Sequence, residues 1–199
     1  MGTSSTPRLP AARRRRQLLD TARTVFAERG FHPTAMNDIA DAAGVTKPVL
    51  YQHFASKRDL YREVLEDVGG RLEETIAKAA IGAPGPREQV EAGFGAYFRF
   101  VAMDQDAFQV LFGGDTRRDP EFARQAAATE ASIAAAIASL IDVEGIDPAH
   151  QGLLAHGLVG LAEGVSRGWL ADGLRQDPDE MARQVAELAW AGLRGVRGP

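Results

Sequence analysis

A short stretch near residue 50 carries polar and basic side chains of the kinds that contact DNA. The Lys47 ammonium suits a phosphate or a base edge, Tyr51 suits a thymine methyl group or a phosphate, and Gln52 suits adenine. His53 and Lys57 are placed to meet backbone phosphates. The complete set of predicted DNA-contacting residues is Thr34, Asn37, Thr46, Lys47, Pro48, Tyr51, Gln52, His53 and Lys57.

Two short helices joined by a tight turn are needed to hold these side chains on one face. Thr34 is placed to cap the first helix, and Gly44 supplies the left-handed residue that ends it. Thr46 then caps the second helix, with Pro48 in its first turn, and Ser56 caps a longer helix that follows. An apolar set can lock the two short helices together: Ile39, Ala40, Ala43, Val45, Leu50 and Phe54. The spacing predicts a helix-turn-helix, which places its second helix in the major groove of DNA.

Spacing alone leaves a second interpretation open, because a solvated amphipathic helix pair can occur in any helical protein. Further positions in fixed register favour DNA binding: Gly30-Phe31, Thr34, Ile39-Ala40, Ala43-Gly44-Val45, Leu50-Tyr51, His53-Phe54 and Ser56-Lys57. Over residues 13–65 they resemble the signature of the tetracycline-repressor (TetR) family. That resemblance implies a DNA-binding domain followed by helices that form a dimerisation surface and a ligand cavity. Pro48 and Asn37 depart from the commonest family pattern, so the exact base contacts stay open.

Charge is divided unevenly along the 199 residues. Residues 1–62 hold 11 Lys/Arg against 5 Asp/Glu, whereas residues 63–199 hold 12 against 22, for a total net charge of -4. The basic first third is therefore the part that a polyanion would attract. The run Arg13–Arg16 has two interpretations, a solvated basic tail or an arm that adds phosphate or minor-groove contacts.

Composition and motifs exclude several kinds of site. The absence of cysteine rules out disulfides, thiolate zinc sites and a Cys nucleophile. The sequence has no phosphate-binding loop, nucleophile elbow or zinc-protease motif, and its four histidines lack metal-ligand spacing on one helix face. We therefore expect neither an enzyme nor a cofactor or metal. No apolar run approaches the ~18 residues of a membrane span, so we expect a cytoplasmic protein without membrane contact.

Apolar spacing predicts helices along the chain and no strand, so the expected fold is all-α with about nine helices. The breaks GAPGP at 82–86 and Gly113-Gly114 separate helical patterns. We predict a disordered leader at 1–12 and a helix-turn-helix DNA-binding domain at 13–60, with the helix from residue 56 linking the domains. A ligand-binding and dimerisation domain is predicted at 61–199.

Aromatic residues concentrated between positions 94 and 112 are expected to face an alanine-rich helix at about 119–141. Aromatic residues at helical spacing usually form core, but large side chains opposite small ones can also leave a cavity. Such a cavity is our hypothesis for a ligand site, with Tyr97 and His156 as polar contacts. Its predicted lining is Phe94, Tyr97, Phe98, Val101, Phe108, Leu111, Phe112, Ile133, Ile137 and His156.

Glycines at every fourth position mark one face of a later helix. An interior helical glycine costs about 1 kcal/mol relative to alanine, which suggests that another helix approaches this face very closely. We expect two helices from each subunit of a homodimer to meet there, the alternative being close packing within one subunit. The predicted interface is Gly160, Gly164, Gly168, Val185, Ala189 and Leu193.

These features predict a homodimeric transcriptional regulator that binds a palindromic operator in double-stranded DNA. The family resemblance favours a repressor that a small apolar effector releases. The segment GLVGLAEGVSRGWL is similar to bacterial regulators of lipid metabolism that bind acyl-CoA-type effectors, so an acyl-type effector is one expectation. An activator of lipid-metabolism genes, an architectural DNA-binding protein and a small helical enzyme are the alternatives.

Overall fold

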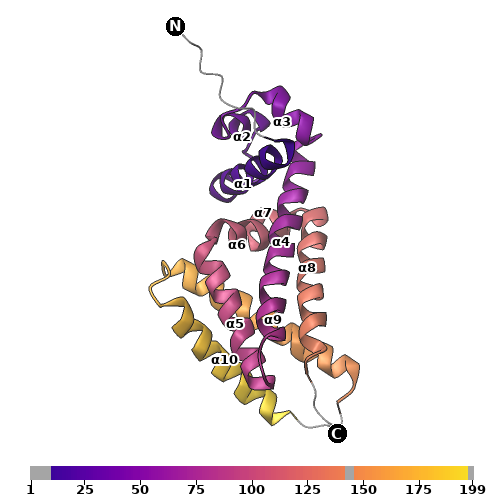
Figure 1. Ribbon diagram of the computed structural model, residues 1–199, viewed down its shortest axis with the longest axis vertical. Helices are drawn as coiled ribbons and strands as arrows, with labels where there is room; N and C mark the ends of the chain where they lie inside the picture. Colours follow the sequence, from indigo (N-terminus) through magenta and orange to yellow (C-terminus); the bar gives the residue numbers. More distant parts are fainter. Residues whose placement is uncertain (1–9, 142–145, 197–199) are drawn as a thin grey trace. The chain divides into compact units, whose positions relative to one another are not determined.

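The computed structural model describes residues 10–141 and 146–196, which form ten helical segments and no strand (Figure 1). The expected all-α fold is thus confirmed over the described residues. The chain divides into two compact units between Glu66 and Asp67, within α4 (Lys57–Ile81), whereas the sequence placed the boundary at 60/61. None of the helices in these ranges is long and apolar enough to cross a membrane.

The first unit contains the helix-turn-helix. It consists of α1 (Ala11–Arg29), α2 (Met36–Ala42), α3 (Lys47–His53) and the first turns of α4. Of the predicted leader, residues 1–9 lie outside the described part, and residues 11 and 12 already belong to α1. The arginines at 13–16 are therefore helical and do not form a tail ahead of the first helix.

Glycines with positive φ end the first two helices, which confirms the predicted role of Gly44. Gly30 closes α1 with φ 84°, and its N–H donates to the Phe26 carbonyl oxygen. Gly44 follows α2 with φ 65°, a left-handed conformation that favours glycine. The turn is closed by the Val45 N–H, which donates to the Ala40 carbonyl oxygen at 2.9 Å.

The predicted cap on α2 is wrong, whereas the predicted cap on α4 is confirmed. Thr34 is 2% exposed, and its hydroxyl donates to a backbone carbonyl oxygen of the preceding turn at 2.7 Å. The Ala35 N–H donates instead to the Asp38 carboxylate at 2.7 Å. At the start of α4, Ser56 Oγ accepts a hydrogen bond from the Asp59 N–H at 3.0 Å.

Apolar faces of all four helices meet in the core of the first unit. The rings of Phe26 and Phe31 pack edge-on against Tyr61, with centroids 4.9 and 5.0 Å from its own. The other buried core residues include Leu18, Ala22, Ile39, Ala40, Leu50, Phe54, Leu60, Val64 and Leu65. This core fixes α3 relative to α1, α2 and the first turns of α4.

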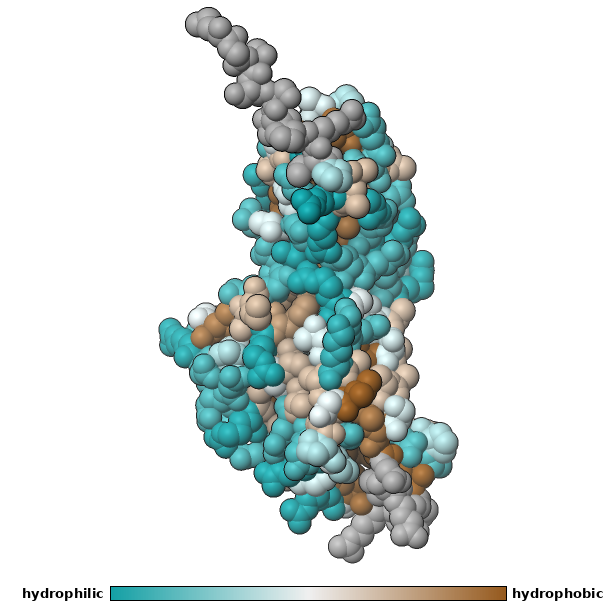
Figure 2. Space-filling view, in the orientation of Figure 1, coloured by the Kyte–Doolittle hydropathy of each residue, from teal (hydrophilic) through white to brown (hydrophobic). Residues whose placement is uncertain are grey.

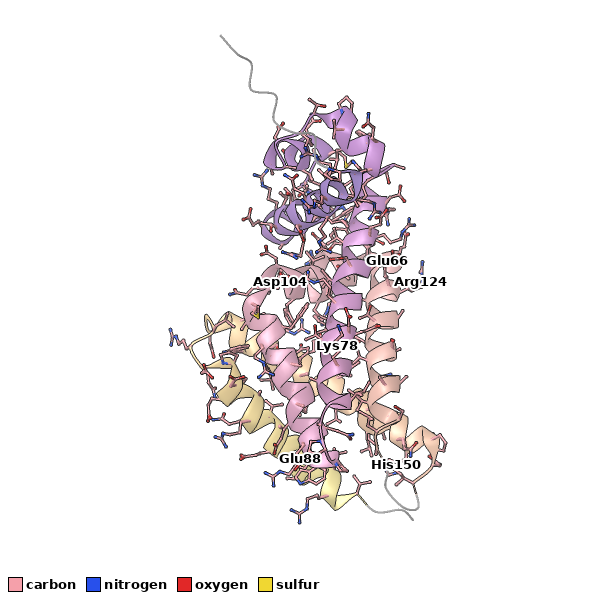
Figure 3. All side chains as sticks on the ribbon, in the orientation of Figure 1. Glu66, Lys78, Glu88, Asp104, Arg124 and His150 are labelled. Atoms are coloured by element: carbon pink, nitrogen blue, oxygen red, sulfur yellow. The ribbon has the colours of Figure 1, made fainter. Side chains whose placement is uncertain are left out.

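The second unit contains the rest of α4 and six further helical segments. These are α5 (Pro86–Met103), α6 (Gln105–Phe112), α7 (Gly114–Arg118), α8 (Pro120–Ala138), α9 (Pro148–Ala171) and α10 (Pro178–Gly195). Aspartates cap four of them by accepting hydrogen bonds from first-turn N–H groups: Asp104, Asp119, Asp147 and Asp177. Asp104, which lies between α5 and α6, also pairs with Arg71 of α4 at 3.0 Å (Figure 3).

Long helix pairs build the core of the second unit, with α5 packed along α10 and α8 along α9. Phe98 of α5 is fully buried and meets Trp169 of α9 edge-on, with ring centroids 5.8 Å apart. Helices α4 and α8 come very close at Gly69, where an added Cβ would lie 2.6 Å from Thr129 Oγ1. A side chain at this position of α4 would therefore have to displace the Thr129 side chain.

Candidate DNA-binding surface and ligand cavity

Helix α3 presents a row of exposed side chains on the first unit. Leu50 on its inner side is fully buried, while Tyr51 is 43% exposed. The Lys47 ammonium lies 5.9 Å from the Tyr51 ring centroid. Five predicted DNA-contacting residues share this exposed surface: Thr46, Lys47, Pro48, Tyr51 and Gln52. Asn37 on α2 is also exposed, and His53 is half-buried. The surface offers hydrogen-bonding groups and an aromatic ring to a major groove.

Two predicted DNA contacts are used inside the unit instead. The Lys57 ammonium donates to the carbonyl oxygens of Phe31 and Thr34 at 2.7 Å and of His32 at 3.1 Å. It also lies 4.4 Å from the Phe31 ring centroid. We therefore correct the role of Lys57 to a structural contact between α4 and the turn before α2. Thr34 is corrected in the same way, because its hydroxyl is buried and bonded within that turn.

The arginine run is built into α1. Arg15 pairs with Glu63 and lies 5.0 Å from the Phe54 ring centroid. Arg16 pairs with Asp20 at 2.6 Å. Both side chains therefore contact their own unit, so the interpretation of a free arm does not hold for them.

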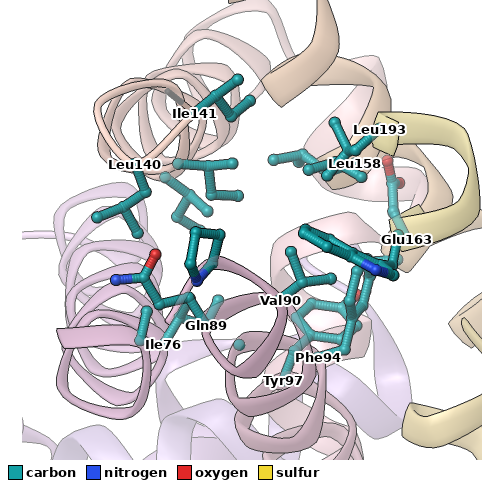
Figure 4. A pocket seen from close by; sticks show the side chains of 18 of the residues that line it. Ile76, Gln89, Val90, Phe94, Tyr97, Leu140, Ile141, Leu158, Glu163 and Leu193 are labelled. Carbon is teal, nitrogen blue, oxygen red and sulfur yellow. The ribbon is translucent and has the colours of Figure 1, made fainter. Parts of the chain in front are cut away.

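A cavity of about 390 Å³ lies among the helices of the second unit (Figure 4). Helices α4, α5, α8, α9 and α10 contribute to its wall, together with Phe112 at the end of α6. Most of the lining is apolar, and its volume lies in the range of small-molecule sites, about 300–1,000 Å³. This is the strongest candidate for an effector site in the described residues.

The predicted lining divides between this cavity and the packed core. The members that line the cavity are Phe94, Tyr97, Phe112, Ile133 and Ile137. The members that lie in the core instead are Phe98, Val101, Phe108 and Leu111. Their faces of α5 and α6 turn toward neighbouring helices, so we correct these positions. His156 is corrected too, because it is exposed and its Nδ1 lies 2.8 Å from the Gly152 carbonyl oxygen.

Residues from α4, α9 and α10 complete the cavity and were missed in the sequence. They include Leu72, Ile76, Leu158, Val159, Ala162, Trp190 and Leu193. Leu72 and Ile76 continue the apolar spacing of α4, which marks them as inward-facing residues. That spacing does not say whether an inward-facing residue meets a cavity or another side chain.

A few polar side chains interrupt the apolar lining: Gln89, Tyr97, Glu130, Glu163 and Arg194. Burial raises the pKa of the Tyr97 hydroxyl, so that it stays protonated and can donate. The Glu163 carboxylate accepts hydrogen bonds from Arg117 of α7 and Arg167 of α9. Glu130 is half-buried, and burial followed by the negative charge of Glu163 raises its pKa.

A second hollow of about 410 Å³ lies between α4 and α8 and shares part of the cavity wall. Ile76, Ile133 and Ile137 line both spaces. Figure 2 shows apolar side chains gathered where these two helices run on the visible face of the second unit. The cavity wall is therefore thin between α4 and α8.

The residues predicted for a dimer interface have two different environments. The three predicted positions on α9 are exposed: Gly160, Gly164 and Gly168. A Cβ added to any of these glycines would meet no atom within 4 Å. The prediction for α10 needs correction, because Val185 and Ala189 are only 6% exposed and are buried within the chain. Leu193 lines the cavity, whereas Leu188 of the same helix is 63% exposed.

These two sites on this fold define a class of protein. A helix-turn-helix with an exposed second helix, continued through α4 into a helical unit with an apolar cavity, is the architecture of a DNA-binding transcriptional regulator. Residues 18–64 match the model of the bacterial regulatory proteins of the tetR family, and residues 86–192 match the tetracyclin repressor-like C-terminal domain. The chain belongs to the TetR family, and the prediction of a regulator that is not an enzyme is confirmed.

Known proteins that resemble the chain are regulators as well. It is 36% identical over 190 residues to the HTH-type transcriptional activator FasR of Mycolicibacterium smegmatis. The matched region covers 95% of this chain and 87% of FasR. The HTH-type transcriptional repressor KstR2 of Rhodococcus jostii is 47% identical over 68 residues, 32% of this chain and 33% of the repressor. The transcriptional regulator FadR of Bacillus subtilis, solved in complex with stearoyl-CoA, shares the fold. Its TM-score is 0.78 at 19% identity, over 92% of this chain and 99% of that chain.

Proposed function

We propose that this regulator is a cytoplasmic, homodimeric repressor that leaves a palindromic operator when an apolar effector occupies the cavity. Helix α4 is the observation that carries the proposal. Its first turns supply Leu60, Val64 and Leu65 to the core of the DNA-binding unit. Its later turns supply Leu72 and Ile76 to the cavity wall. A change in the cavity therefore acts on a helix that is also part of the DNA-binding unit.

The effector acts through a difference in affinity between two conformations of the dimer. To shift their ratio from 1:99 to 99:1, it must bind the favoured conformation about 10⁴-fold more tightly. A largely apolar wall supplies such a difference when one conformation removes more apolar surface from water than the other. In this mechanism the conformation that fits the operator holds the effector less well.

A twofold dimer fits a palindromic operator, because each half-site then receives one α3. The two α3 helices reach successive major grooves when they lie about one helical turn apart, roughly 34–36 Å. The exposed glycine face of α9 supports such a dimer, since a face without side chains lets another helix approach closely. Leu153 lies on the same face and is 70% exposed.

An acyl-type effector suits this cavity. Its wall is formed mainly by aliphatic and aromatic side chains such as Val90, Phe94 and Ile137, which gain most from contact with a hydrocarbon chain. Gln89 and Arg194, near the start of α5 and the end of α10, offer contacts to a polar or anionic head group.

Filling the cavity tests the proposal. Gly93 lines it, and a Cβ added there would meet no atom within 4 Å, so Gly93→Leu places a side chain in open space. We expect this variant to bind a mapped operator fragment as the wild type does, while release by stearoyl-CoA needs a concentration raised by about tenfold or more. Gly93→Ala is the matched control, because it changes helix propensity similarly and fills little space. Unchanged release from Gly93→Leu would contradict the proposal.

Activation is the second candidate, because the chain is 36% identical to an activator over 95% of its length. Transcription in vitro from a promoter with a mapped binding site separates the two. A repressor lowers the amount of transcript and stearoyl-CoA restores it. An activator raises the amount of transcript when it binds.

A further inference from the structure

The arginines of the DNA-binding unit differ in what holds their side chains. Five arginines pair with a carboxylate of the same unit: Arg15, Arg16, Arg23, Arg29 and Arg62. Arg14 has a different partner, because its Nη1 donates to the side-chain oxygen of Gln17 at 2.8 Å. Among the described residues no carboxylate pairs with Arg14. Since an amide carries no charge, the positive charge of Arg14 stays uncompensated on α1.

The side chain of Gln17 connects Arg14 to the turn between α2 and α3. Its Oε1 accepts the hydrogen bond from Arg14, and its Nε2 donates to the Ala43 carbonyl oxygen at 3.3 Å. Ala43 ends α2, and the chain runs from it through Gly44 and Val45 into α3. Two hydrogen bonds thus hold the Arg14 guanidinium beside the turn that positions the DNA-reading helix.

A cation beside this turn meets the DNA backbone when α3 enters the major groove. The groove is about 12 Å wide, and a phosphate backbone borders it on each side. The N-terminal residues of a reading helix contact base edges, so the segment just before that helix passes close to one of the two backbones. Half to two-thirds of protein–DNA hydrogen bonds go to phosphate and sugar. A phosphate is therefore the expected partner of Arg14.

The Arg14 guanidinium has donors left for such a contact. It carries five N–H donors, and the bond to Gln17 uses one of them. Arg14 is half-buried, and its Nε and Nη2 remain open to solvent, whereas a nitrogen of Arg71 is buried without a hydrogen bond. The planar fork of a guanidinium matches two phosphate oxygens. Because Gln17 already holds this side chain, ordering it on DNA costs less conformational entropy than ordering a free arginine.

We propose that Arg14 is a further DNA-binding residue, which binds a backbone phosphate beside the bases that α3 reads, and that Gln17 is its positioning residue. The contact raises affinity and fixes the orientation of the unit without reading sequence. It depends on DNA binding by α3 and is independent of the effector and of repression. The arginine run then has a divided role, since Arg15 and Arg16 pair within the unit and Arg14 binds DNA.

Fluorescence anisotropy of the full chain tests the proposal, with a mapped operator fragment and a duplex of scrambled sequence over a salt series. Arg14→Ala should lower the affinity for both duplexes about tenfold. It should also reduce the slope of log K against log salt by about one per subunit. Arg16→Ala is the matched control, because it removes the same charge from the same helix, but from a side chain that Asp20 already holds. It should leave both affinities within about twofold.

Two outcomes of this comparison would overturn the phosphate contact. Equal effects of Arg14→Ala and Arg16→Ala would mean that only the net charge of the unit matters. A loss of affinity confined to the operator would mean that Arg14 reads bases. Thermal denaturation of Arg14→Ala should give the melting temperature of the wild type, because its guanidinium bonds only to a side chain one turn away.

A double-mutant cycle tests the positioning role of Gln17. Gln17→Met keeps the length of the side chain and removes both of its hydrogen bonds. It should weaken the binding of both duplexes about threefold in the wild-type background and have no further effect when combined with Arg14→Ala. The same loss in both backgrounds would mean that Gln17 only supports the turn before α3, and its role in positioning Arg14 would be wrong.

Discussion

Lys47 and Lys57 differ in what surrounds their ammonium groups. Lys47 is exposed on α3, whereas Lys57 donates to three backbone carbonyl oxygens. We expect Lys47→Ala to weaken operator binding and to reduce the slope of log K against log salt by about one, with thermal stability unchanged. Lys57→Ala should lower the free energy of unfolding by about 1–2 kcal/mol, because the carbonyl oxygens lose a charged donor.

Fluorescence anisotropy over a salt series measures the first effect, and thermal denaturation measures the second. The two lysines serve as controls for each other, since both changes remove one positive charge from the same unit. If Lys57→Ala changed the salt slope and left stability intact, its assignment as a structural contact would be wrong.

Glu130 predicts a dependence of stability on pH. Burial and the charge of Glu163 raise its pKa in the folded protein. Such a carboxyl group favours folding below its unfolded pKa of about 4.3, and this contribution is lost as pH rises through the higher folded value. Glu130→Gln stays uncharged throughout. We therefore expect this variant to have a higher melting temperature than the wild type at neutral pH, and an equal one at about pH 4 and below.

Glu74→Gln provides a control of opposite sign for this pH effect. Glu74 is exposed, and a hydrogen bond from Lys78 lowers its pKa. A carboxyl group of this kind favours folding above its unfolded pKa, and the contribution is lost as pH falls. Its removal should therefore lower the melting temperature slightly at neutral pH. A difference between Glu130→Gln and the wild type that does not change with pH would contradict the explanation by ionisation.

At the scale of the helices, two adjacent glycines of α4 have opposite surroundings. A Cβ on Gly69 would lie 2.6 Å from Thr129 Oγ1 and 3.1 Å from Thr129 Cγ2, whereas a Cβ on Gly70 would meet no atom within 4 Å. Thr129 is β-branched and has few alternative rotamers in a helix. We expect Gly69→Ala to lower the free energy of unfolding by about 1–3 kcal/mol. Gly70→Ala should raise it by up to about 1 kcal/mol through helix propensity.

Chemical denaturation of the two single variants and of Gly69→Ala combined with Thr129→Ala measures these effects. The double variant removes both branches of the threonine, so it should recover most of the stability lost in Gly69→Ala. Equal stability of Gly69→Ala and Gly70→Ala would show that α4 and α8 do not need this close approach.

Helix ends could be predicted from the sequence, because local residues determine them. Gly44 and Ser56 act where their residue types indicate. Thr34 does not cap α2, because the N-cap of that helix is Ala35, one residue later, and the Thr34 hydroxyl donates to the Gly30 carbonyl oxygen. Which helix face meets a cavity could not be predicted, since that depends on how helices pack. Phe94 and Phe98 are one turn apart on α5 and look alike in the sequence, yet only Phe94 lines the cavity.

The dependence on helix packing also explains why the surroundings of the charged residues in the sites could not be predicted from the sequence. Glu163 has the sequence pattern of a solvated helix position, but in the structure it lies in the cavity wall and accepts from two arginines. Lys57 follows a helix cap beside the DNA-reading residues, and its side chain turns inward to backbone oxygens. The partners of Lys57, and the partner Arg117 of Glu163, come from segments far away in the chain, whereas Arg167 lies one turn from Glu163 on α9.

At the scale of the whole molecule, the basic part of the chain ends close to the boundary between the two units. Residues 1–62 have 11 basic and 5 acidic side chains, while residues 63–199 have 12 and 22. Attraction to DNA is therefore concentrated in the unit that carries α3, and the acidic remainder opposes binding through any other surface. A dimer carries two of these basic DNA-binding units, so it can bind both half-sites of an operator at once.

Gly164 tests the proposed dimer. An added side chain would meet no atom of its own chain within 4 Å, so Gly164→Leu should leave the fold of each subunit intact and clash only with a partner. We expect a monomer by size-exclusion chromatography with light scattering, and a steep loss of affinity for a two-half-site operator because the half-sites are no longer bound jointly. Gly70→Leu is the matched control, since it adds the same side chain at another open glycine and should remain dimeric. A stable dimer of Gly164→Leu, with operator affinity equal to that of the control, would exclude this face of α9 as the interface.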